Sequence, residues 1–295
     1  MIDIEVADES CLCDFTFDFY WQHRGSRLNP DDYVDGVSYR KLVDALKKGE
    51  TIRIRGDTGS RLGSSLGVDL KTFGGVGGPI EEVGKIIVDG NVGTRMGISM
   101  LRGSIYISGE AEAPLGNVVE VETDLSGYRK YVSVTEVLER GGPVIPPNLL
   151  TDEGLILEDG AVRETLAARN TAPKEIKIAG DAGMSAGILM RRGSIEIDGD
   201  AGRNTGVLMR GGRIVVNGSS DDFTATEMRG GEIYVQRSAG GYICAKMRGG
   251  AVYAKDGRPV PPARAYQLNQ YDIRRVANAL KINALHAMAY RKFCL

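Results

Sequence analysis

Hydrophobic and polar residues alternate in short runs that return at a fixed interval along the chain. Ile176-Lys177-Ile178 is followed nineteen residues later by Ile195-Glu196-Ile197. Each run places its β-branched side chains on one face and its polar side chains on the other, which predicts a strand with one face in the core. Further units of this kind begin at residues 213 and 232, and the same register is found from residues 51, 85, 104 and 251.

Glycine marks fixed positions within each unit. Gly180, Gly183 and Gly187 occupy the sixth, ninth and thirteenth positions of the unit that starts at residue 175. Glycine suits corners that need positive φ and places where two backbones approach closely. The unit is too short for a strand and a crossover helix, which take about 30 residues together. The pattern therefore predicts an all-β solenoid, a parallel β-helix of nineteen-residue coils stacked about 4.8 Å apart.

Two other residue types form columns in such a stack. The first is a core column of Leu66, Met100, Met190, Met209, Met228 and Met247. An arginine follows each of the last four, at Arg191, Arg210, Arg229 and Arg248. Like charges about 4.8 Å apart repel by on the order of 0.9 kcal/mol per neighbouring pair in bulk water. Either solvent and local carboxylates compensate this arginine column, or an acidic partner protein does.

The repeat divides the chain into three predicted regions. Strands and a short helix are expected in 1–50, the β-helix in 51–258 with interruptions at about 68–83 and 118–174, and a helical cap in 259–295. The N-terminal helix spans 38–48 and ends at Gly49. Insertions into a solenoid often carry a partner contact, but a purely structural bulge is an equal alternative.

Local patterns place two further helices outside the coils. Asn269 is a suitable N-cap for a C-terminal helix, which would plug the last coil. The second interruption contains a short helix from about Thr135 to Arg140. Apolar residues follow a helical stripe in the C-terminal helix, at Ile273, Val276, Ala277 and Leu280.

Composition and charge exclude several classes of partner. The 295 residues include 40 glycines, and the net charge is −2 with a pI near 5.9. No basic stripe suits nucleic acid, and no run approaches the roughly 20 apolar residues that a membrane helix needs. The acidic N-terminal sequence has no signal-peptide pattern, so a cytoplasmic protein is expected.

Candidate chemistry is sparse. Cys11, Cys13, Cys244 and Cys294 have no spacing typical of zinc or iron–sulfur ligands, and the two histidines, His23 and His286, lie in no nucleophile motif. The glycine pattern has neither the lysine nor the helix of a phosphate-binding loop. Recurrent carboxylates such as Asp181, Glu196 and Asp200 are interpreted as solvated outer positions. No catalytic, cofactor-binding or metal-ligating residue is predicted in this chain.

The coils over about 50–257, together with PLGNVVEVETDLSGYRKYVSVTEVL at 114–138, resemble a known family. It is shared by the C-terminal domain of glutamate synthase and the β-helix subunit of formylmethanofuran dehydrogenase, and segment 114–138 is similar to the dehydrogenase branch. The resemblance implies a right-handed β-helix. Ala225 and Cys244 depart from the pattern because they replace the glycine at the thirteenth position.

The resemblance further implies a scaffold role in an oxidoreductase complex of methanogenic or related one-carbon metabolism, which reduces carbon dioxide and attaches the formyl group to methanofuran. A tungsten- or molybdenum-pterin, iron–sulfur clusters and a dinuclear metal site are then expected in other subunits. These partners would be amidohydrolase-like, molybdopterin/iron–sulfur and polyferredoxin chains. Candidate docking residues are the four of the arginine column and Asn117, Tyr128, Arg129 and Lys130.

Three alternatives stay open at this point. The chain could be the β-helix subunit of a formyltransferase/hydrolase complex, or an ammonia-channelling domain similar to that of glutamate synthase. A polysaccharide-binding β-helix would need aromatic platforms, but aromatic residues are only 6% of the chain and the single tryptophan, Trp21, precedes the repeat.

Overall fold

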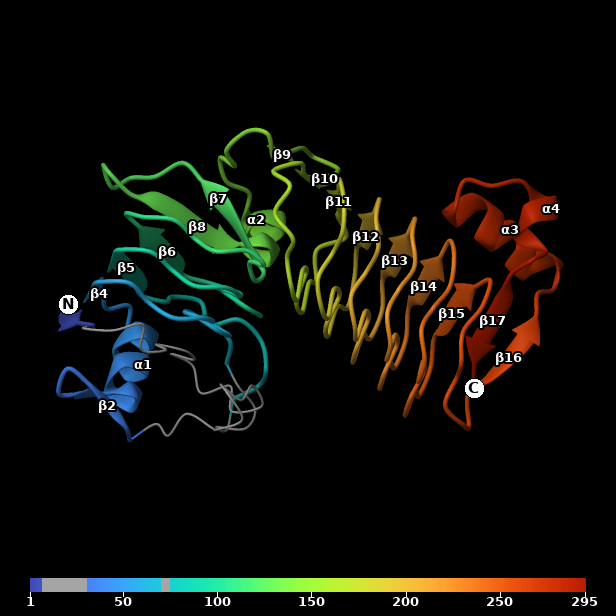
Figure 1. Cartoon of the computed structure of the whole chain (residues 1–295), viewed down its shortest axis with the longest axis horizontal. Helices are drawn as coiled ribbons and strands as arrows, with labels where there is room; N and C mark the ends of the chain where they lie inside the picture. The colour runs from blue at the N-terminus through green and yellow to red at the C-terminus, as the bar shows by residue number, and fades with distance from the viewer. Residues whose placement is uncertain (7–30, 70–74) are drawn as a thin grey trace. The chain divides into compact units, whose positions relative to one another are not determined.

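The chain divides into two compact units, Met1–Ile145 and Pro146–Leu295 (Figure 1). A computed structural model describes residues 1–6, 31–69 and 75–295. Cys11, Cys13, Trp21 and His23 lie outside the described residues. The first unit contains a six-stranded sheet and the second a nine-stranded sheet, and a two-stranded sheet is formed by β2 and β3.

Three coils of the first unit carry the parallel strands β4, β5 and β6. Strand β1 adds to β4 in parallel, and the hairpin of β7 and β8 adds to β6 in antiparallel direction. The elements are β1 (Ile2–Glu5), β2 (Tyr33–Val34), β3 (Val37–Ser38), α1 (Tyr39–Lys47), β4 (Ile52–Arg55), β5 (Lys85–Asp89), β6 (Ser104–Ile107), β7 (Val118–Val121), β8 (Arg129–Ser133) and α2 (Val134–Arg140).

Six coils of the second unit carry the parallel strands β10 to β15. Antiparallel strands close both ends of this series, because β9 pairs with β10 and β17 pairs with β15. The elements are β9 (Leu149–Leu150), β10 (Gly154–Leu157), β11 (Glu175–Ile178), β12 (Ser194–Ile197), β13 (Arg213–Val216), β14 (Glu232–Val235), β15 (Ala251–Ala254), β16 (Arg264–Gln267), α3 (Gln270–Ala279), α4 (Ala284–Ala287) and β17 (Arg291–Cys294).

The predicted solenoid and its core are confirmed. Strand registers from β11 to β14 advance by nineteen residues per coil, as between Ile176 and Ile195. Every side chain of the predicted core column is at most 4% exposed. Their burial supports the interpretation of the recurrent methionines as packing residues.

The two predicted helices at the ends of the coils form where their caps lie. Ser38 accepts the N–H of Lys41 at the start of α1, whose Leu42 and Val43 are fully buried. Asn269 accepts the N–H of Asp272 at the start of α3. Helix α2 begins one residue before the predicted Thr135 and ends at the predicted Arg140.

The stretch expected to leave the coil at 118–174 contains one more coil. Strand β10 pairs in parallel with β11, and Gly154 lies opposite Glu175. This coil is 21 residues long, and Asn170 stands at the place of the core methionine, so the nineteen-residue pattern does not reveal it. Asn170 is 1% exposed, and its amide donates to the carbonyls of Ala172 and Arg192 at 3.0 and 2.9 Å.

The C-terminal segment closes the solenoid differently from the expected plug. Strand β17 pairs with β15 and covers the backbone edge of the last coil. Helix α3 lies against the outer face of the sheet, where its Val276 and Leu280 join a cluster with Tyr234 and Tyr253 (Figure 1). Strand β17 supplies hydrogen bonds to the backbone groups of the last coil, and helix α3 buries apolar side chains on the outer face of the sheet.

Glycine at the thirteenth position is favoured by its backbone conformation and by close packing. Gly206 has a φ of +70°, and a Cβ there would lie 2.3 Å from Cδ1 of Ile233. Ala225 adopts nearly the same φ, +61°. The residue that corresponds to Ile233 one coil later is Val252, which has no Cδ1 atom. The departure at Ala225 is therefore matched by a smaller side chain in the facing strand.

We expect Gly206→Ala to lower the free energy of unfolding by about 1 to 3 kcal/mol, because it adds backbone strain and overpacking. The reverse change, Ala225→Gly, should stay within about 1 kcal/mol of the wild type. Urea denaturation followed by far-ultraviolet circular dichroism measures both. Equal losses in the two variants would contradict the proposed fit between positions 206 and 233.

An ion pair within the additional coil predicts acid sensitivity. The side chain of Asp159 is 23% exposed and pairs with Arg163, which is 2% exposed. Burial opposes ionisation of Asp159, but the hydrogen bond and charge of Arg163 outweigh it and lower the pKa from 3.8 to about 2. A lowered pKa stabilises the fold above about pH 4, and this contribution is lost as the pH falls towards 2.

Replacement of this carboxylate, Asp159→Asn, should therefore cost about 1 to 2 kcal/mol at pH 7, after allowance for solvent screening. The gap between variant and wild type should close between pH 4 and pH 2. Urea denaturation at stepped pH measures it, with the exposed Asp152→Asn as control. A gap that does not change with pH would show that the ion pair has no linkage to folding.

Candidate interaction surface

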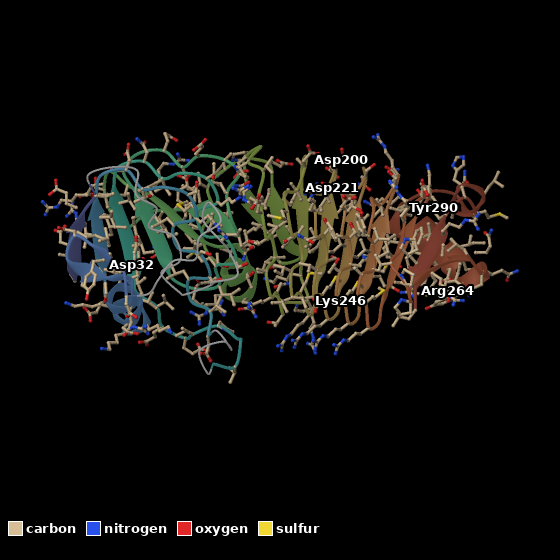
Figure 2. The ribbon with its side chains drawn as sticks, turned by 60° about the horizontal axis from the view of Figure 1, so that its bottom comes forward. Asp32, Asp200, Asp221, Lys246, Arg264 and Tyr290 are labelled. Carbon is tan, nitrogen blue, oxygen red and sulfur yellow. The ribbon has the colours of Figure 1, made fainter. Side chains whose placement is uncertain are left out.

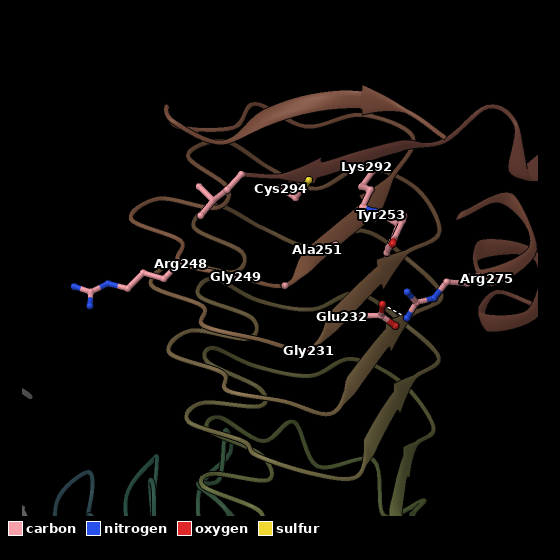
Figure 3. Close-up of a pocket in the computed structure, with 11 residues that line it drawn as sticks. Gly231, Glu232, Arg248, Gly249, Ala251, Tyr253, Arg275, Lys292 and Cys294 are labelled. Carbon is pink, nitrogen blue, oxygen red and sulfur yellow. Dashed lines mark ion pairs between the residues drawn. The ribbon is translucent and has the colours of Figure 1, made fainter. Parts of the chain in front are cut away.

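The arginine column is a surface feature of the second unit. The backbone N–H groups of Arg210, Arg229 and Arg248 donate to the carbonyl oxygens of the methionines one coil earlier, at 2.8, 2.8 and 2.7 Å. This ladder holds the arginines one above another. All four side chains of the column are exposed, and Figure 3 shows Arg248 pointing away from its coil.

No carboxylate compensates this column within the described part of the chain. None of its four guanidinium groups forms an ion pair with an aspartate or glutamate of residues 1–6, 31–69 or 75–295. The sequence allowed local carboxylates to compensate the arginine column, and the described residues show no such pairing. Within the part of the chain that the structure describes, solvent or a partner protein is left to compensate this charge.

Residues beside the column add both charge and apolar surface. Figure 2 shows a row of nitrogen-ended side chains along the coil edge that carries Lys246, whereas Asp200 and Asp221 lie on the opposite edge. Leu189 and Leu208 are half-buried and stand two residues before arginines of the column. The methionine between each pair is buried, whereas the leucine is partly accessible and the arginine is exposed, so both offer surface to a partner.

The acidic edge has a structural task that the sequence did not reveal. Oδ1 of Asp181 accepts the backbone N–H of Asp200 at 2.7 Å, and Oδ1 of Asp200 accepts that of Ser219 at 2.7 Å. In the first unit, Asp57 accepts the N–H of Asn91 in the same way, and this hydrogen bond lowers the pKa of Asp57. Asp181 and Asp200 are therefore exposed as predicted but also brace the next coil. Both aspartates directly follow a glycine of the repeat, and this recurrent Gly-Asp pair is the sequence feature that could have indicated the bracing role.

Asn117 is a structural residue, which corrects its prediction as a docking residue. It is fully buried, and its amide donates to the carbonyl of Met100 at 2.9 Å and to the hydroxyl of Thr135 at 3.0 Å. Ser133 donates to the same carbonyl at 2.7 Å. These bonds attach the start of β7 and the start of α2 to the preceding coil.

Tyr128 and Arg129 face carboxylates of their own unit. The Tyr128 hydroxyl donates to Asp89 at 2.5 Å. Arg129 contacts Glu120 through two nitrogens and Glu110 through a third contact at 2.6 Å. The hydrogen bonds to Glu120 raise the pKa of Arg129. Both side chains therefore fasten the hairpin onto its coil, and a docking role for them stays a prediction.

Lys130 is also occupied within its unit. Its ammonium group donates to Asp124 at 2.8 Å and lies 5.3 Å from the centre of the Tyr106 ring. Hydrogen bonds from Lys130 and from the Tyr106 hydroxyl hold the pKa of Asp124 well below its usual range. Of the predicted docking residues, the arginine column alone is left with uncompensated charge among the described residues.

A pocket of about 420 Å³ lies beside the last coils of the second unit (Figure 3). Its charged side chains are largely paired, since Arg275 contacts Glu232 and Lys292 contacts Asp272 at 3.0 Å. The Tyr253 hydroxyl also donates to Asp272, at 3.0 Å. These charged groups are thus engaged with one another.

The described residues contain no group of three His, Cys, Asp or Glu side chains that could hold a metal ion. Among the same residues, none of the helices is both long and apolar enough to span a bilayer. The thiol of Cys244 is fully buried, and this burial raises its pKa to about 12. The expectation that this chain carries no cofactor or metal stays a prediction.

Comparison with known proteins connects the chain to an archaeal relative. A protein of Methanothermobacter thermautotrophicus, whose function is uncharacterised, is 46% identical over 199 residues, which are 66% of this chain and 65% of that protein. The match thus spans just under two thirds of the relative's length. No protein-family model matches the chain.

Among solved structures, a chain of the formyltransferase/hydrolase complex of Methylorubrum extorquens, crystallised with methylofuran, aligns over 85% of this chain and 68% of its own length. The sequence identity is 22% and the TM-score is 0.36. A likeness of this size carries no argument about function.

The uncompensated column predicts a stability effect that depends on salt. Arg229→Gln should raise the free energy of unfolding of the isolated chain by a few tenths of a kcal/mol, roughly, near 10 mM NaCl. Near 1 M NaCl the gain should vanish, because the screening length falls from about 30 Å to about 3 Å. Urea denaturation at both salt concentrations measures it. Arg237→Gln, an exposed arginine outside the column, is the control and should show no gain.

Proposed function

We propose that this chain is a non-catalytic scaffold subunit of formylmethanofuran dehydrogenase, the complex that reduces carbon dioxide and attaches the resulting formyl group to methanofuran. The identity of the complex rests on the resemblance of segment 114–138. The scaffold role rests on one structural observation: the conspicuous residues of the repeat are engaged in core, corner or backbone bracing, and only the arginine column has no internal partner among the described residues.

Segment 114–138 lies at the end of the coil series of the first unit. It forms the hairpin of β7 and β8 and most of α2, and it adds to the coil that carries β6. A solenoid edge left open would expose unpaired backbone groups. The segment therefore closes the coil series of its unit and presents an outer surface formed by the hairpin and α2.

Under this proposal the chemistry belongs to other subunits. A tungsten- or molybdenum-pterin with iron–sulfur clusters would carry the redox step, and an amidohydrolase-like subunit with a dinuclear metal site would carry formyl transfer. This chain would hold these subunits together and take no part in the reaction. A formyltransferase/hydrolase complex is a close alternative, because it has a similar β-helix subunit, and a co-purifying pterin with iron–sulfur clusters would exclude it.

A polysaccharide-binding role has little support. Phe223 and Tyr242 form an exposed aromatic pair on adjacent coils, 37% and 58% exposed. Their rings stack on each other with centroids 5.1 Å apart. Because each ring already covers one face of the other, the pair offers little flat surface to a sugar ring.

Purification of the complex from its native source tests the proposal. We expect the chain to co-purify with a molybdopterin subunit and an amidohydrolase-like subunit, with tungsten or molybdenum and iron in the preparation. Metal analysis and identification of the chains by mass spectrometry measure this. A complex without pterin and iron–sulfur clusters would favour the formyltransferase/hydrolase alternative, and a chain purified alone would overturn the scaffold role.

Charge reversal in the arginine column tests its part in assembly. The double variant Arg210→Glu and Arg229→Glu should lower the yield of co-purified partner subunits about tenfold or more, because like charges then face an acidic partner. The matched control reverses two exposed arginines outside the column, Arg237→Glu and Arg274→Glu, and should retain assembly. Equal yields from the two double variants would exclude docking through the column.

A further inference from the structure

The spacing of the arginine column restricts the shape of what can bind it. Its four members are attached one coil apart, and neighbouring strands of a sheet lie about 4.8 Å apart. The column therefore extends over roughly 14 Å along the axis of the coils. A ligand that pairs with every arginine must present its negative charges in a straight row with nearly the same interval.

A helix provides such a row more closely than a strand does. Residues three and four apart on one helix face have Cβ atoms about 5 to 6 Å apart. Residues on one face of a strand are two apart and therefore separated by roughly 6.6 Å. Flexible arginine side chains can absorb a mismatch of about 1 Å per step, but a mismatch near 2 Å accumulates to more than one coil over the column.

Apolar surface beside the column favours a protein partner over nucleic acid. Leu189 and Leu208 are half-buried and lie next to Arg191 and Arg210 on the outer side of their coils. The corresponding residues of the next two coils are Glu227 and Lys246. An amphipathic helix could place apolar side chains on the leucines and carboxylates on the arginines.

We infer that the arginine column binds an acidic amphipathic helix of a partner protein, laid along the axis of the coils. This inference rests on the proposed scaffold function and adds the kind of element that docks. A helix of about 12 residues covers the column, because at 1.5 Å per residue its first and last glutamates are separated by roughly 16.5 Å along the axis. Its glutamates would occupy positions i, i+4, i+7 and i+11, with leucines beside the first two.

Designed peptides of equal composition test the inference on the full-length chain. The row peptide is a fluorescein-labelled 18-residue helix with glutamates at i, i+4, i+7 and i+11 and leucines adjacent. In the permuted peptide the same residues are distributed around the helix. Fluorescence anisotropy should show the row peptide binding about tenfold tighter or more, with affinity that weakens from 50 to 300 mM NaCl.

Variants of the protein identify the surface that the peptide uses. Arg210→Glu with Arg229→Glu should weaken binding of the row peptide at least about tenfold, whereas Arg237→Glu with Arg274→Glu should change it less than about twofold. Circular dichroism melting verifies that both double variants are folded. Equal affinity for the row and permuted peptides, or equal loss in the two variants, would overturn the inference.

Two further outcomes would replace the inference by another. Tighter binding of a 20-nucleotide thymidine oligomer than of the row peptide would assign the column to nucleic acid. Self-association that the column variant abolishes, measured by sedimentation velocity, would assign it to a second copy of the chain. If the row peptide binds but the chain purifies alone from its source, the proposed function fails and the inference stands. If the complex purifies but the row peptide does not bind, the inference fails and the proposed function stands.

Discussion

The structure depends on the backbone ladder that joins each coil to the next. From β11 to β14 the register advances by nineteen residues per coil. Hydrogen bonds outside the strands recur at the same interval, since the bond from Arg210 to Met190 is repeated nineteen residues later from Arg229 to Met209. A fixed register places every residue type in a column with its equivalents about 4.8 Å away. The residue type of each column then decides whether the column stabilises the stack, requires hydrogen bonds to offset its charge, or is left with uncompensated charge.

Three kinds of column stabilise the stack from within. Buried methionine and isoleucine fill the interior, as Met209 and Ile214 do at 0% exposure. Glycine permits close approach, as at Gly206. Aspartate satisfies a backbone N–H of the following coil, as Asp200 does for Ser219. The last arrangement is the reason that a column of carboxylates is tolerated, because each charge is bound to a donor.

The arginine column has no comparable task among the described residues. A guanidinium group has only donors, and none of these four forms an ion pair with a carboxylate of the described residues. Repeated positive charge is therefore left on one coil edge while negative charge lies on the opposite one (Figure 2). Water solvates these exposed groups in the isolated chain, and under the proposed function an acidic partner would supply carboxylates to them.

The ends of each coil series show how the solenoid avoids open edges. In the second unit, β9 and β17 pair in antiparallel direction with the first and last parallel strands. In the first unit, β8 does the same for β6. Antiparallel pairing needs only a turn in the chain, so short segments outside the repeat can supply it. These segments carry little repeat signal, although they satisfy the outermost coils.

The sequence by itself determined the solenoid, its nineteen-residue coils, the core column and the caps at Ser38 and Asn269, because these follow from local periodicity and short-range hydrogen bonds. Tertiary structure alone decided the coil at 154–174, since its identity lies in pairing with β11 and not in its own pattern. It also decided that Asn117 is buried and that Arg129 meets Glu120 while the arginine column meets no carboxylate of the described chain. The environment of each of these side chains depends on which residues the fold brings into contact with it. The residue type at one position is not enough to predict that environment.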